Sequence, residues 1–300
     1  MSYALLFSGQ GMQHPDMLSW LARDGTVQVV EQLFGGDWRQ QLAAPEWAGR
    51  NALAQPLLTG LALAALEQLS PLLPAPTAVA GYSVGELAAF AATGVYDVAT
   101  ALTLAQRRAA SMDACAADYP TGLLGISGMV LTSVMRLCAD FGLKVAIRNG
   151  IDSVVVGGPR LALSAAEKVA QREGARCTRL NVQVASHTPW MADAAQSFAA
   201  LIAPLPFASP RCALFTNVAG RVATVPQLKQ ALARQISQTV RWDECMDGIA
   251  ARKVKCVLEI GPGQALARMW NQRYVHIPGR SVDEFRSARA IAQWVHRWST

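Results

Sequence analysis

Residues 78–92 constrain the fold of this chain more than any other segment. Val79-Ala80 predicts a short strand, the pentapeptide Gly81–Gly85 (Gly-Tyr-Ser-Val-Gly) follows it, and the helix predicted from Glu86 to Ala92 is apolar on nearly all sides. A helix of that kind is buried against a sheet. Glycines on both sides of a serine relieve crowding where a strand turns sharply into a helix, and the hydroxyl then stands at the helix N-terminus. Ser83 is therefore a candidate nucleophile, although a five-residue pattern alone also fits an ordinary turn.

Strands and long helices alternate through much of the chain. The expected elements are a strand over 3–7, a helix over about 51–70, a helix over about 97–112, and strands over 214–215 and 254–260. Asp97 is a favoured N-cap residue, and prolines end the helix over 51–70. This alternation predicts an α/β fold with a large, hydrolase-like domain whose mainly parallel sheet is covered by helices on both faces.

Between residues 120 and 187 the order of predicted elements changes. Strands and helices follow one another as β-α-β-β-α-β, which is the ferredoxin-like arrangement. The expected strands lie over 122–127, 145–147, 154–156 and 178–182, and the expected helices over about 133–140 and 164–173. We therefore expect a ferredoxin-like subdomain over 120–187, inserted in a large domain that consists of residues 1–119 and 188–300.

Composition excludes several classes of protein. Hydrophobic residues make up 52% of the 300 residues and charged residues 16%, which argues against a disordered chain. No uninterrupted apolar run is long enough to predict a membrane-spanning helix, and the N-terminal segment lacks the basic residues and cleavage site of an export signal. The 6 cysteines form no Cys-x-x-Cys pair, so we expect no metal site, and scattered thiols fit the reducing cytoplasm.

Charge is distributed unevenly along the chain. Residues 1–150 carry 8 basic and 11 acidic side chains and residues 151–300 carry 19 and 10, so the net charges of the two halves are −3 and +9. A basic surface can attract nucleic acid, a membrane, or an acidic protein or ligand, and it can also be an ordinary solvated surface. Because the basic residues form no dense runs with aromatic residues between them, nucleic acid is the weakest of these candidates. We expect neither nucleic acid nor a membrane as a partner.

A serine nucleophile needs a base, and the chain has 4 histidines. His187 lies in a polar turn after the last strand predicted in the insertion, so it is a candidate base, although a lone histidine is more often structural. No acidic partner for it can be assigned from the sequence. The loop Gly9-Gln10-Gly11 fits either a tight turn or a backbone whose N–H groups approach a ligand, as an oxyanion hole requires. Arg107 and Arg108, taken alone, fit an exposed helix surface.

Taken together, these segments resemble one family. Several motifs in one order are specific, and here they cover nearly the whole chain in the order found in malonyl-CoA:acyl carrier protein transacylases. The motifs are Phe7-Ser8-Gly9-Gln10-Gly11, Gly81-Tyr82-Ser83-Val84-Gly85-Glu86, Arg108, Ala185-Ser186-His187, Thr216-Asn217-Val218, Arg234-Gln235 and Glu259-Ile260-Gly261-Pro262-Gly263. The resemblance implies an acyltransferase.

The resemblance also implies a role for each matching position. Ser83 corresponds to the nucleophile that carries the acyl group and His187 to its base. Gln235 corresponds to the residue whose main-chain carbonyl orients that histidine, so a Ser-His dyad without an acidic third member is expected. The backbone N–H groups of Gln10 and Val84 correspond to the oxyanion hole.

Substrate recognition is implied in the same way. Arg108 matches the arginine that binds the free malonyl carboxylate, a task for which the planar guanidinium suits better than a lysine. Asn217 and Tyr82 would help to form the substrate pocket. The resemblance implies no bound cofactor: malonyl-CoA is the expected substrate, and the thiol of a carrier's prosthetic group is the expected acceptor.

Two positions depart from the family pattern. The family usually has His where this chain has Tyr82, and Pro where it has Ser8. The sequence Gly-Tyr-Ser-Val-Gly-Glu, with Gly-Gln-Gly-Met near the start, is most similar to the epsilon subunit of malonate decarboxylase. We therefore expect a cytoplasmic malonyltransferase whose acceptor is the carrier subunit of malonate decarboxylase. The alternatives are the transacylase of fatty acid synthesis, which uses acyl carrier protein, a serine esterase, and a docking subunit without activity.

Overall fold

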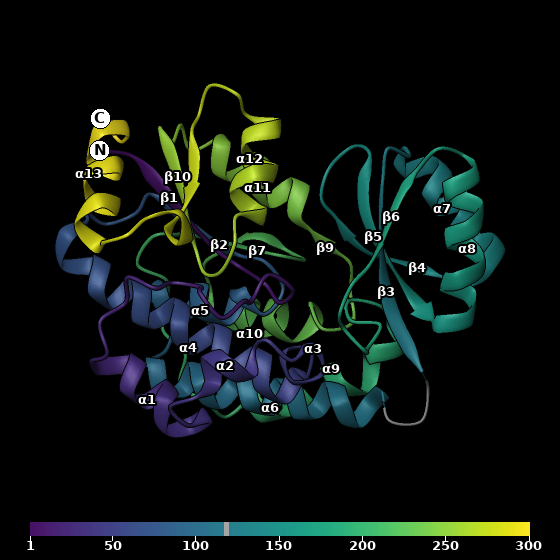
Figure 1. Ribbon diagram of the computed structural model, residues 1–300, viewed down its shortest axis with the longest axis horizontal. Coiled ribbons are helices and arrows are strands. Elements are labelled where there is room, and N and C mark those ends of the chain that lie inside the picture. The colour runs from purple at the N-terminus through teal and green to yellow at the C-terminus, as the bar shows by residue number, and fades with distance from the viewer. Residues whose placement is uncertain (117–119) are drawn as a thin grey trace.

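Two sheets of unequal size organise the chain and lie beside each other in Figure 1. The computed structural model describes residues 1–116 and 120–300. In the larger sheet five neighbouring strands run parallel, and the edge strand β8 runs antiparallel to β7. Its strands, in spatial order, are β11 (Gly279–Ser281), β10 (Cys256–Ile260), β1 (Tyr3–Phe7), β2 (Ala78–Gly81), β7 (Ala213–Thr216) and β8 (Gly220–Val222).

Helices cover both faces of the larger sheet. Side chains alternate along β1, so that Tyr3, Leu5 and Phe7 belong to one apolar core and Ala4 and Leu6 to the other. In Figure 1 the helices α4, α5 and α6 lie below the sheet, and α11 and α12 lie above it. These helices span Asn51–Leu69 (α4), Gly85–Ala92 (α5), Val98–Ala116 (α6), Trp242–Ala250 (α11) and Ala265–Arg273 (α12). The expected mainly parallel sheet with two covered faces is confirmed.

Further helices complete the large domain. They are α1 (Gly25–Phe34), α2 (Trp38–Gln41), α3 (Pro45–Ala48), α9 (Ala192–Ile202), α10 (Val225–Arg234) and α13 (Ala288–Trp298), with single turns of 3-10 helix at Ser70–Leu72, Pro189–Met191 and Val282–Glu284. Asp97 caps α6 as expected, because its carboxylate accepts a hydrogen bond from the backbone N–H of Thr100 at 2.8 Å. The helix continues past Met112, where we expected it to end, to Ala116.

Helix α4 forms the centre of one core. Together with the turn that follows, its segment Asn51–Leu72 is long and apolar enough to cross a membrane by length and composition, but most of its apolar stretch is buried inside the protein. The helix contacts α6, α1 and α5 through Leu and Ala side chains. Burial on all sides explains why it is apolar all round.

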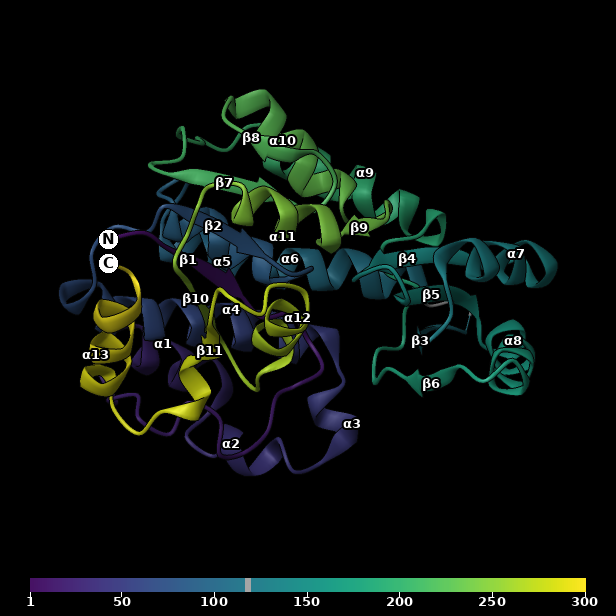
Figure 2. The same cartoon turned by 90° about the horizontal axis from the view of Figure 1, so that it is seen from above.

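The smaller sheet belongs to the inserted lobe. Its order is β6-β3-β5-β4-β9, and the first four of these strands are antiparallel neighbours, as in a ferredoxin-like fold. Figure 2 shows α7 and α8 together on the outer side of this sheet, away from the large domain. The elements are β3 (Thr121–Ser127), α7 (Leu131–Phe141), β4 (Lys144–Arg148), β5 (Ser153–Pro159), α8 (Arg160–Arg172) and β6 (Arg176–Arg179).

Two features of the lobe differ from the expectation. Strand β6 ends at Arg179 instead of continuing to Val182, although the N–H of Leu180 still donates to the carbonyl of Leu123 in β3 at 3.2 Å. A further strand, β9 (Val240–Arg241), comes from the chain of the large domain and pairs in parallel with β4. The expected boundary after residue 119 falls at residues 117–119, which lie outside the described residues, and the proposed subdomain limits stay a prediction.

Candidate active site

Ser83 stands at a strained turn between β2 and α5. Its φ is 55°, in the left-handed region that non-glycine residues rarely adopt. The flanking glycines are required by space: a Cβ on Gly81 would lie 2.1 Å from the carbonyl oxygen of Gly85, and a Cβ on Gly85 would lie 2.3 Å from the carbonyl oxygen of Phe7. The elbow predicted from the sequence is therefore present, and its geometry depends on both glycines.

The side chain of Asn217 holds this elbow by hydrogen bonds to its backbone. Its side-chain Oδ1 accepts a hydrogen bond from the N–H of Ser83 at 2.9 Å, and its Nδ2 donates to the carbonyl of Gly81 at 2.6 Å. The backbone N–H of Asn217 donates to the buried carboxyl group of Glu86 at 2.7 Å. We expected Asn217 in the substrate pocket, but it lies behind the nucleophile and is not among the residues that line the cavity at Ser83.

His187 completes a hydrogen-bonded pair with Ser83. The Ser83 Oγ lies 2.7 Å from His187 Nε2, and His187 Nδ1 lies 2.5 Å from the main-chain carbonyl oxygen of Gln235. A carbonyl oxygen only accepts, so Nδ1 carries the ring hydrogen and Nε2 of the neutral imidazole is free to accept the serine proton. The backbone N–H of His187 donates to the carbonyl of Ile236 at 2.8 Å, which fixes the turn that carries the ring.

The surroundings of His187 keep it neutral. The residue is 1% exposed, and burial together with the nearby positive charge of Arg108 lowers its pKa to about 3. The hydrogen bond to Gln235 opposes this shift without cancelling it. The imidazole is thus a base in its unprotonated form throughout the ordinary pH range.

Two backbone N–H groups beside Ser83 have no hydrogen-bond acceptor among the described residues. They belong to Gln10, in the loop after β1, and to Val84, at the start of α5. Gly9 brings the loop close to the elbow, since a Cβ there would lie 2.8 Å from the Tyr82 ring. Unoccupied donors of this kind beside a nucleophile can bind the negative oxygen of a tetrahedral intermediate.

Ser8 and Glu259 hold the start of this loop. The Ser8 hydroxyl donates to Glu259 Oε1 at 2.9 Å, and the other contacts of that carboxyl group are the N–H groups of Leu266 and Ala267 at the N-terminus of α12. The departure of Ser8 from the family pattern therefore has a structural role, because a proline could not make this bond.

Arg108 is a buried cation that contacts no acidic side chain within residues 1–116 and 120–300. It is 1% exposed, its Nη1 donates to Gln55 Oε1 at 2.7 Å, and its Nη2 donates to Gln235 Oε1 at 3.2 Å. Its Nε has no hydrogen-bond partner among the described residues. Burial lowers the pKa of Arg108 to about 10, and the charge of Glu86 partly opposes that shift. An uncompensated buried charge is costly, so this arrangement favours a ligand that brings a negative group.

A small cavity of about 40 Å³ joins Ser83, His187 and Arg108. One wall is polar and belongs to the large domain, with Gln10, Asn51 and Gln55 beside Arg108. The lining that comes from the inserted lobe includes Leu123, Ile147, Leu180 and Val182, and we name these four residues the apolar wall. The cavity is thus small, with a cation in its polar wall.

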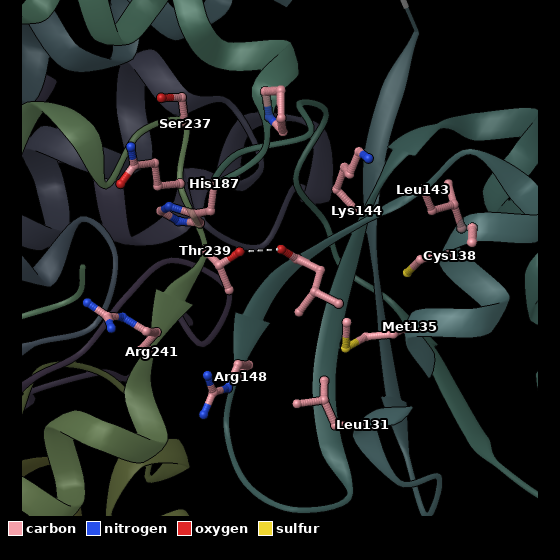
Figure 3. Close-up of a pocket in the computed structure, with 14 residues that line it drawn as sticks. Leu131, Met135, Cys138, Leu143, Lys144, Arg148, His187, Ser237, Thr239 and Arg241 are labelled. Carbon is pink, nitrogen blue, oxygen red and sulfur yellow. Dashed lines mark hydrogen bonds between the residues drawn. The ribbon is translucent and has the colours of Figure 1, made fainter. Parts of the chain in front are cut away.

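Two larger clefts border this cavity. The wider, of about 680 Å³, lies between the inserted lobe and residues 237–241, and Figure 3 shows α7 and β4 on one side of it and Thr239 and Arg241 on the other. It shares only His187 with the small cavity. The second cleft, of about 330 Å³, is polar, contains Arg160 and Arg179, and shares Leu123, Leu180 and Val182 with the small cavity.

The structure thus brings Ser83, His187, Gln10, Val84, Gln235, Arg108 and Tyr82 together, and it places Asn217 just behind them. Gln55 is the site residue that we missed. It is 1% exposed, and its polar side chain holds the guanidinium of Arg108 from within the apolar helix α4. Asn51 and Gln55 are four residues apart and lie on one helix face. Two polar residues at that spacing, in a helix otherwise rich in Leu and Ala, could have indicated a site residue.

Comparison with known proteins agrees with this geometry. Residues 5–296 match the model of the acyl transferase domain family. The chain is 33% identical over 294 residues to the malonyl CoA-acyl carrier protein transacylase of Mycobacterium tuberculosis strain H37Rv, an alignment that covers 93% of this chain and 95% of that protein.

Solved structures are similar over the whole chain. The malonyl CoA-acyl carrier protein transacylase of Coxiella burnetii has a TM-score of 0.91 and 25% identity, with 100% of this chain and 98% of that chain covered. A malonyl-transacylase solved in complex with its type II PKS acyl-carrier protein has a TM-score of 0.86 and 27% identity, with 98% and 99% covered.

The depressed pKa of His187 predicts how the reactivity of Ser83 depends on pH. A protonated His187 cannot accept the serine proton, so Ser83 loses reactivity as the pH falls through the pKa of His187. A lower pKa of His187 therefore moves this loss to lower pH. We expect the rate at which a small fluorophosphonate labels Ser83 to change little between pH 8 and pH 5. A histidine with the ordinary pKa of about 6.5 would lose about 30-fold over this range. A loss of labelling centred near pH 6.5, in protein that circular dichroism shows to be folded, would contradict the assignment.

Proposed function

Because this chain belongs to the acyl transferase domain family, we propose that it moves a malonyl group from the thioester of coenzyme A to the thiol of an acyl carrier protein. The observation that carries the proposal is Arg108, a fully buried cation that lines the same small cavity as Ser83 and His187 and whose Nε–H meets no acceptor in the part of the chain that the structure describes. Malonyl differs from acetyl by a carboxylate, and this carboxylate would supply the negative partner that Arg108 needs. The names of the relatives support the same substrate and acceptor.

The proposed first half-reaction transfers malonyl to Ser83. His187 Nε2 takes the hydroxyl proton while Ser83 Oγ attacks the thioester carbonyl carbon. The N–H groups of Gln10 and Val84 bind the oxygen that becomes negative. The carbon–sulfur bond then breaks, the coenzyme A sulfur leaves with the proton from His187, and a malonyl ester of Ser83 remains.

The second half-reaction repeats these steps in the reverse sense. A carrier thiol gives its proton to His187 and attacks the ester carbonyl, and Ser83 Oγ leaves with that proton. Binding of the carboxylate also acts on the base: the charge of Arg108 is one of the causes of the low pKa of His187, so a carboxylate on Arg108 raises the basicity of His187 when malonyl is bound. This coupling favours malonyl over acyl groups without a charge.

The contacts of His187 weigh against the esterase alternative. A serine esterase would have an acidic residue bonded to the histidine, and the group bonded to His187 Nδ1 is the main-chain carbonyl of Gln235. This supports the proposed dyad. The 6 cysteines are all free thiols, which supports the cytoplasmic location that belongs to the same proposal. We propose that no cofactor is bound and that the reaction uses only coenzyme A and carrier thiols.

The acceptor requires a choice between two carriers. On the sequence alone we expected the carrier subunit of malonate decarboxylase, with acyl carrier protein as the alternative. The relatives described above are named for acyl carrier protein, and one of the solved structures is a complex with such a carrier. These findings favour the alternative, so we propose acyl carrier protein as the acceptor.

The polar cleft is the route that we propose for the thioester arm. It shares three residues of the apolar wall with the small cavity, whereas the wider cleft meets the cavity only at His187. Arg160 and Arg179 in the polar cleft can contact the phosphate that coenzyme A and a carrier's prosthetic group have in common. Both arginines belong to the basic half of the chain, which would attract an acidic carrier.

A pulse of malonyl-CoA followed by a chase with carrier tests this function. The pulse should add one malonyl mass to a Ser83 peptide, and holo acyl carrier protein should remove it faster than a malonate decarboxylase carrier does. Transfer to the carrier should slow as salt rises from about 0.05 to 0.5 M, because the Debye length falls from about 14 Å to about 4 Å.

Three results would contradict parts of this proposal. An adduct that persists in Ser83→Ala would place the nucleophile elsewhere. No adduct on the wild-type chain would support the inactive docking subunit. A clear preference for the malonate decarboxylase carrier would restore the acceptor that we first expected, while leaving the chemistry at Ser83 unchanged.

Removal of Arg108 tests the selectivity. Arg108→Ala should lower malonyl transfer by roughly 30- to several-thousand-fold, because one partner of a buried charge pair is lost. Its activity with acetyl-CoA, relative to malonyl-CoA, should rise. Arg107→Ala is the matched control, because Arg107 is exposed on the same helix and should leave both rates unchanged. A malonyl-to-acetyl preference that survives in Arg108→Ala would show that another group recognises the carboxylate.

A further inference from the structure

Tyr82, the residue before the nucleophile, reaches from the elbow to the inserted lobe. Its hydroxyl donates a hydrogen bond of 3.0 Å to Asn149 Oδ1, and Asn149 directly follows strand β4. Tyr82 also lines the cavity at Ser83. One side chain therefore connects the nucleophile of the large domain with a strand of the lobe.

Packing fixes the orientation of the Tyr82 ring. The ring meets Trp242 edge to face, with centroids 5.3 Å apart and planes at 80°. On the side of the loop after β1, a Cβ on Gly9 would come within 2.8 Å of Tyr82 Cδ1. Because Trp242 and the Gly9 loop restrict the ring, the Tyr82 hydroxyl stays directed at Asn149. The hydrogen bond can therefore fix the position of Asn149 relative to the elbow.

Other contacts between the lobe and the large domain lie beside this bond. Strand β4 pairs with β9 at Ile147 and Arg148, and Arg148 forms an ion pair of 2.7 Å with Asp243. These contacts attach the lobe to β9 and α11. The Tyr82–Asn149 bond attaches it directly to the elbow, two residues beyond Ile147 of the apolar wall.

The apolar wall has a chemical task in acyl transfer. An ester on Ser83 that waits for a carrier thiol also faces water, whose oxygen can attack the ester carbonyl and give its proton to His187. Ser83 Oγ would then leave with that proton, and free malonate would be lost. Exclusion of water from the cavity prevents this side reaction, and the four residues of the apolar wall exclude it only while the lobe stays close to Ser83.

We propose that Tyr82 is a positioning residue that holds the apolar wall over Ser83 through its bond to Asn149 and so protects the acyl-serine from hydrolysis. The inference rests on the proposed function, since it concerns the lifetime of the malonyl ester. It also gives a role to the position at which this chain departs from the histidine usual in the family.

The test compares hydrolysis with transfer in malonyl-Ser83. Tyr82→Phe keeps the ring and removes the hydroxyl, and Asn149→Ala removes its partner. Loss of one such hydrogen bond should raise the rate of malonate release, relative to transfer to holo carrier, about 3- to 10-fold in each variant. The double variant should show no larger change than either single one, because both remove the same interaction.

Tyr3→Phe is the matched control. It also removes a tyrosine hydroxyl that donates a hydrogen bond, here of 2.7 Å to the carbonyl of Pro74, at the other end of the sheet from Ser83, and it should hydrolyse the ester at the wild-type rate. Equal hydrolysis in wild type, Tyr82→Phe and Asn149→Ala would overturn the inference, as would an effect of Tyr82→Phe that Asn149→Ala lacks.

Failure of the proposed function would give a different result. If wild-type protein forms no malonyl adduct, the proposed function fails, and the same variants are compared through the acetyl ester of Ser83 formed from p-nitrophenyl acetate. Faster loss of acetate from Tyr82→Phe and Asn149→Ala would then support the positioning role, and equal loss in all variants would overturn it.

Discussion

The close contact between the elbow and the end of β1 is the constraint on which the site depends. Gly85 lies so near the carbonyl of Phe7 that a Cβ would come within 2.3 Å of its oxygen, and the N–H of Tyr82 donates to that same carbonyl at 2.9 Å. Because β1 runs directly into the loop that contains Gln10, this contact sets the loop beside Ser83. Nucleophile and oxyanion donors are thus placed by one packing interaction of two parallel strands.

Electrostatics give this site its selectivity. The cavity holds a cation, Arg108, and a neutral base, His187, and Gln235 contacts both, with its side-chain oxygen on the guanidinium and its main-chain oxygen on the imidazole. Gln235 Nε2 also donates to the carbonyl of Ser83 at 3.4 Å. A carboxylate bound to Arg108 therefore contributes its binding energy next to the reacting atoms. It also neutralises the charge of Arg108, which raises the basicity of His187.

Much of this could be predicted from the sequence, because local signals were strong. The strand, the glycines around Ser83 and the apolar helix α5 each point to the elbow, and the β-α-β-β-α-β order indicates the lobe without any knowledge of contacts. Roles for Arg108 and Gln235 came from the resemblance alone, because nothing local separates Arg108 from the exposed Arg107.

Features that depend on tertiary contacts could not be predicted. Strand β9 has two residues and forms only because β4 lies beside it. Leu180 and Val182 have the alternation of a strand, and we extended β6 over them, but they are apolar because they face the cavity at Ser83. The position of Asn217 behind the elbow, instead of in the pocket, likewise follows from the parallel pairing of β2 with β7, which no pattern in the sequence indicates.

The central claim is that Arg108 receives the carboxylate of an acyl group carried by Ser83. A crystal structure of the malonyl-enzyme tests it most directly. We predict an ester on Ser83 Oγ, its carbonyl oxygen within hydrogen-bond distance of the Gln10 and Val84 N–H groups, and its carboxylate bound by Nε and a terminal nitrogen of Arg108. A carboxylate turned toward solvent or the apolar wall, with Arg108 still bonded only to Gln55 and Gln235, would contradict the account.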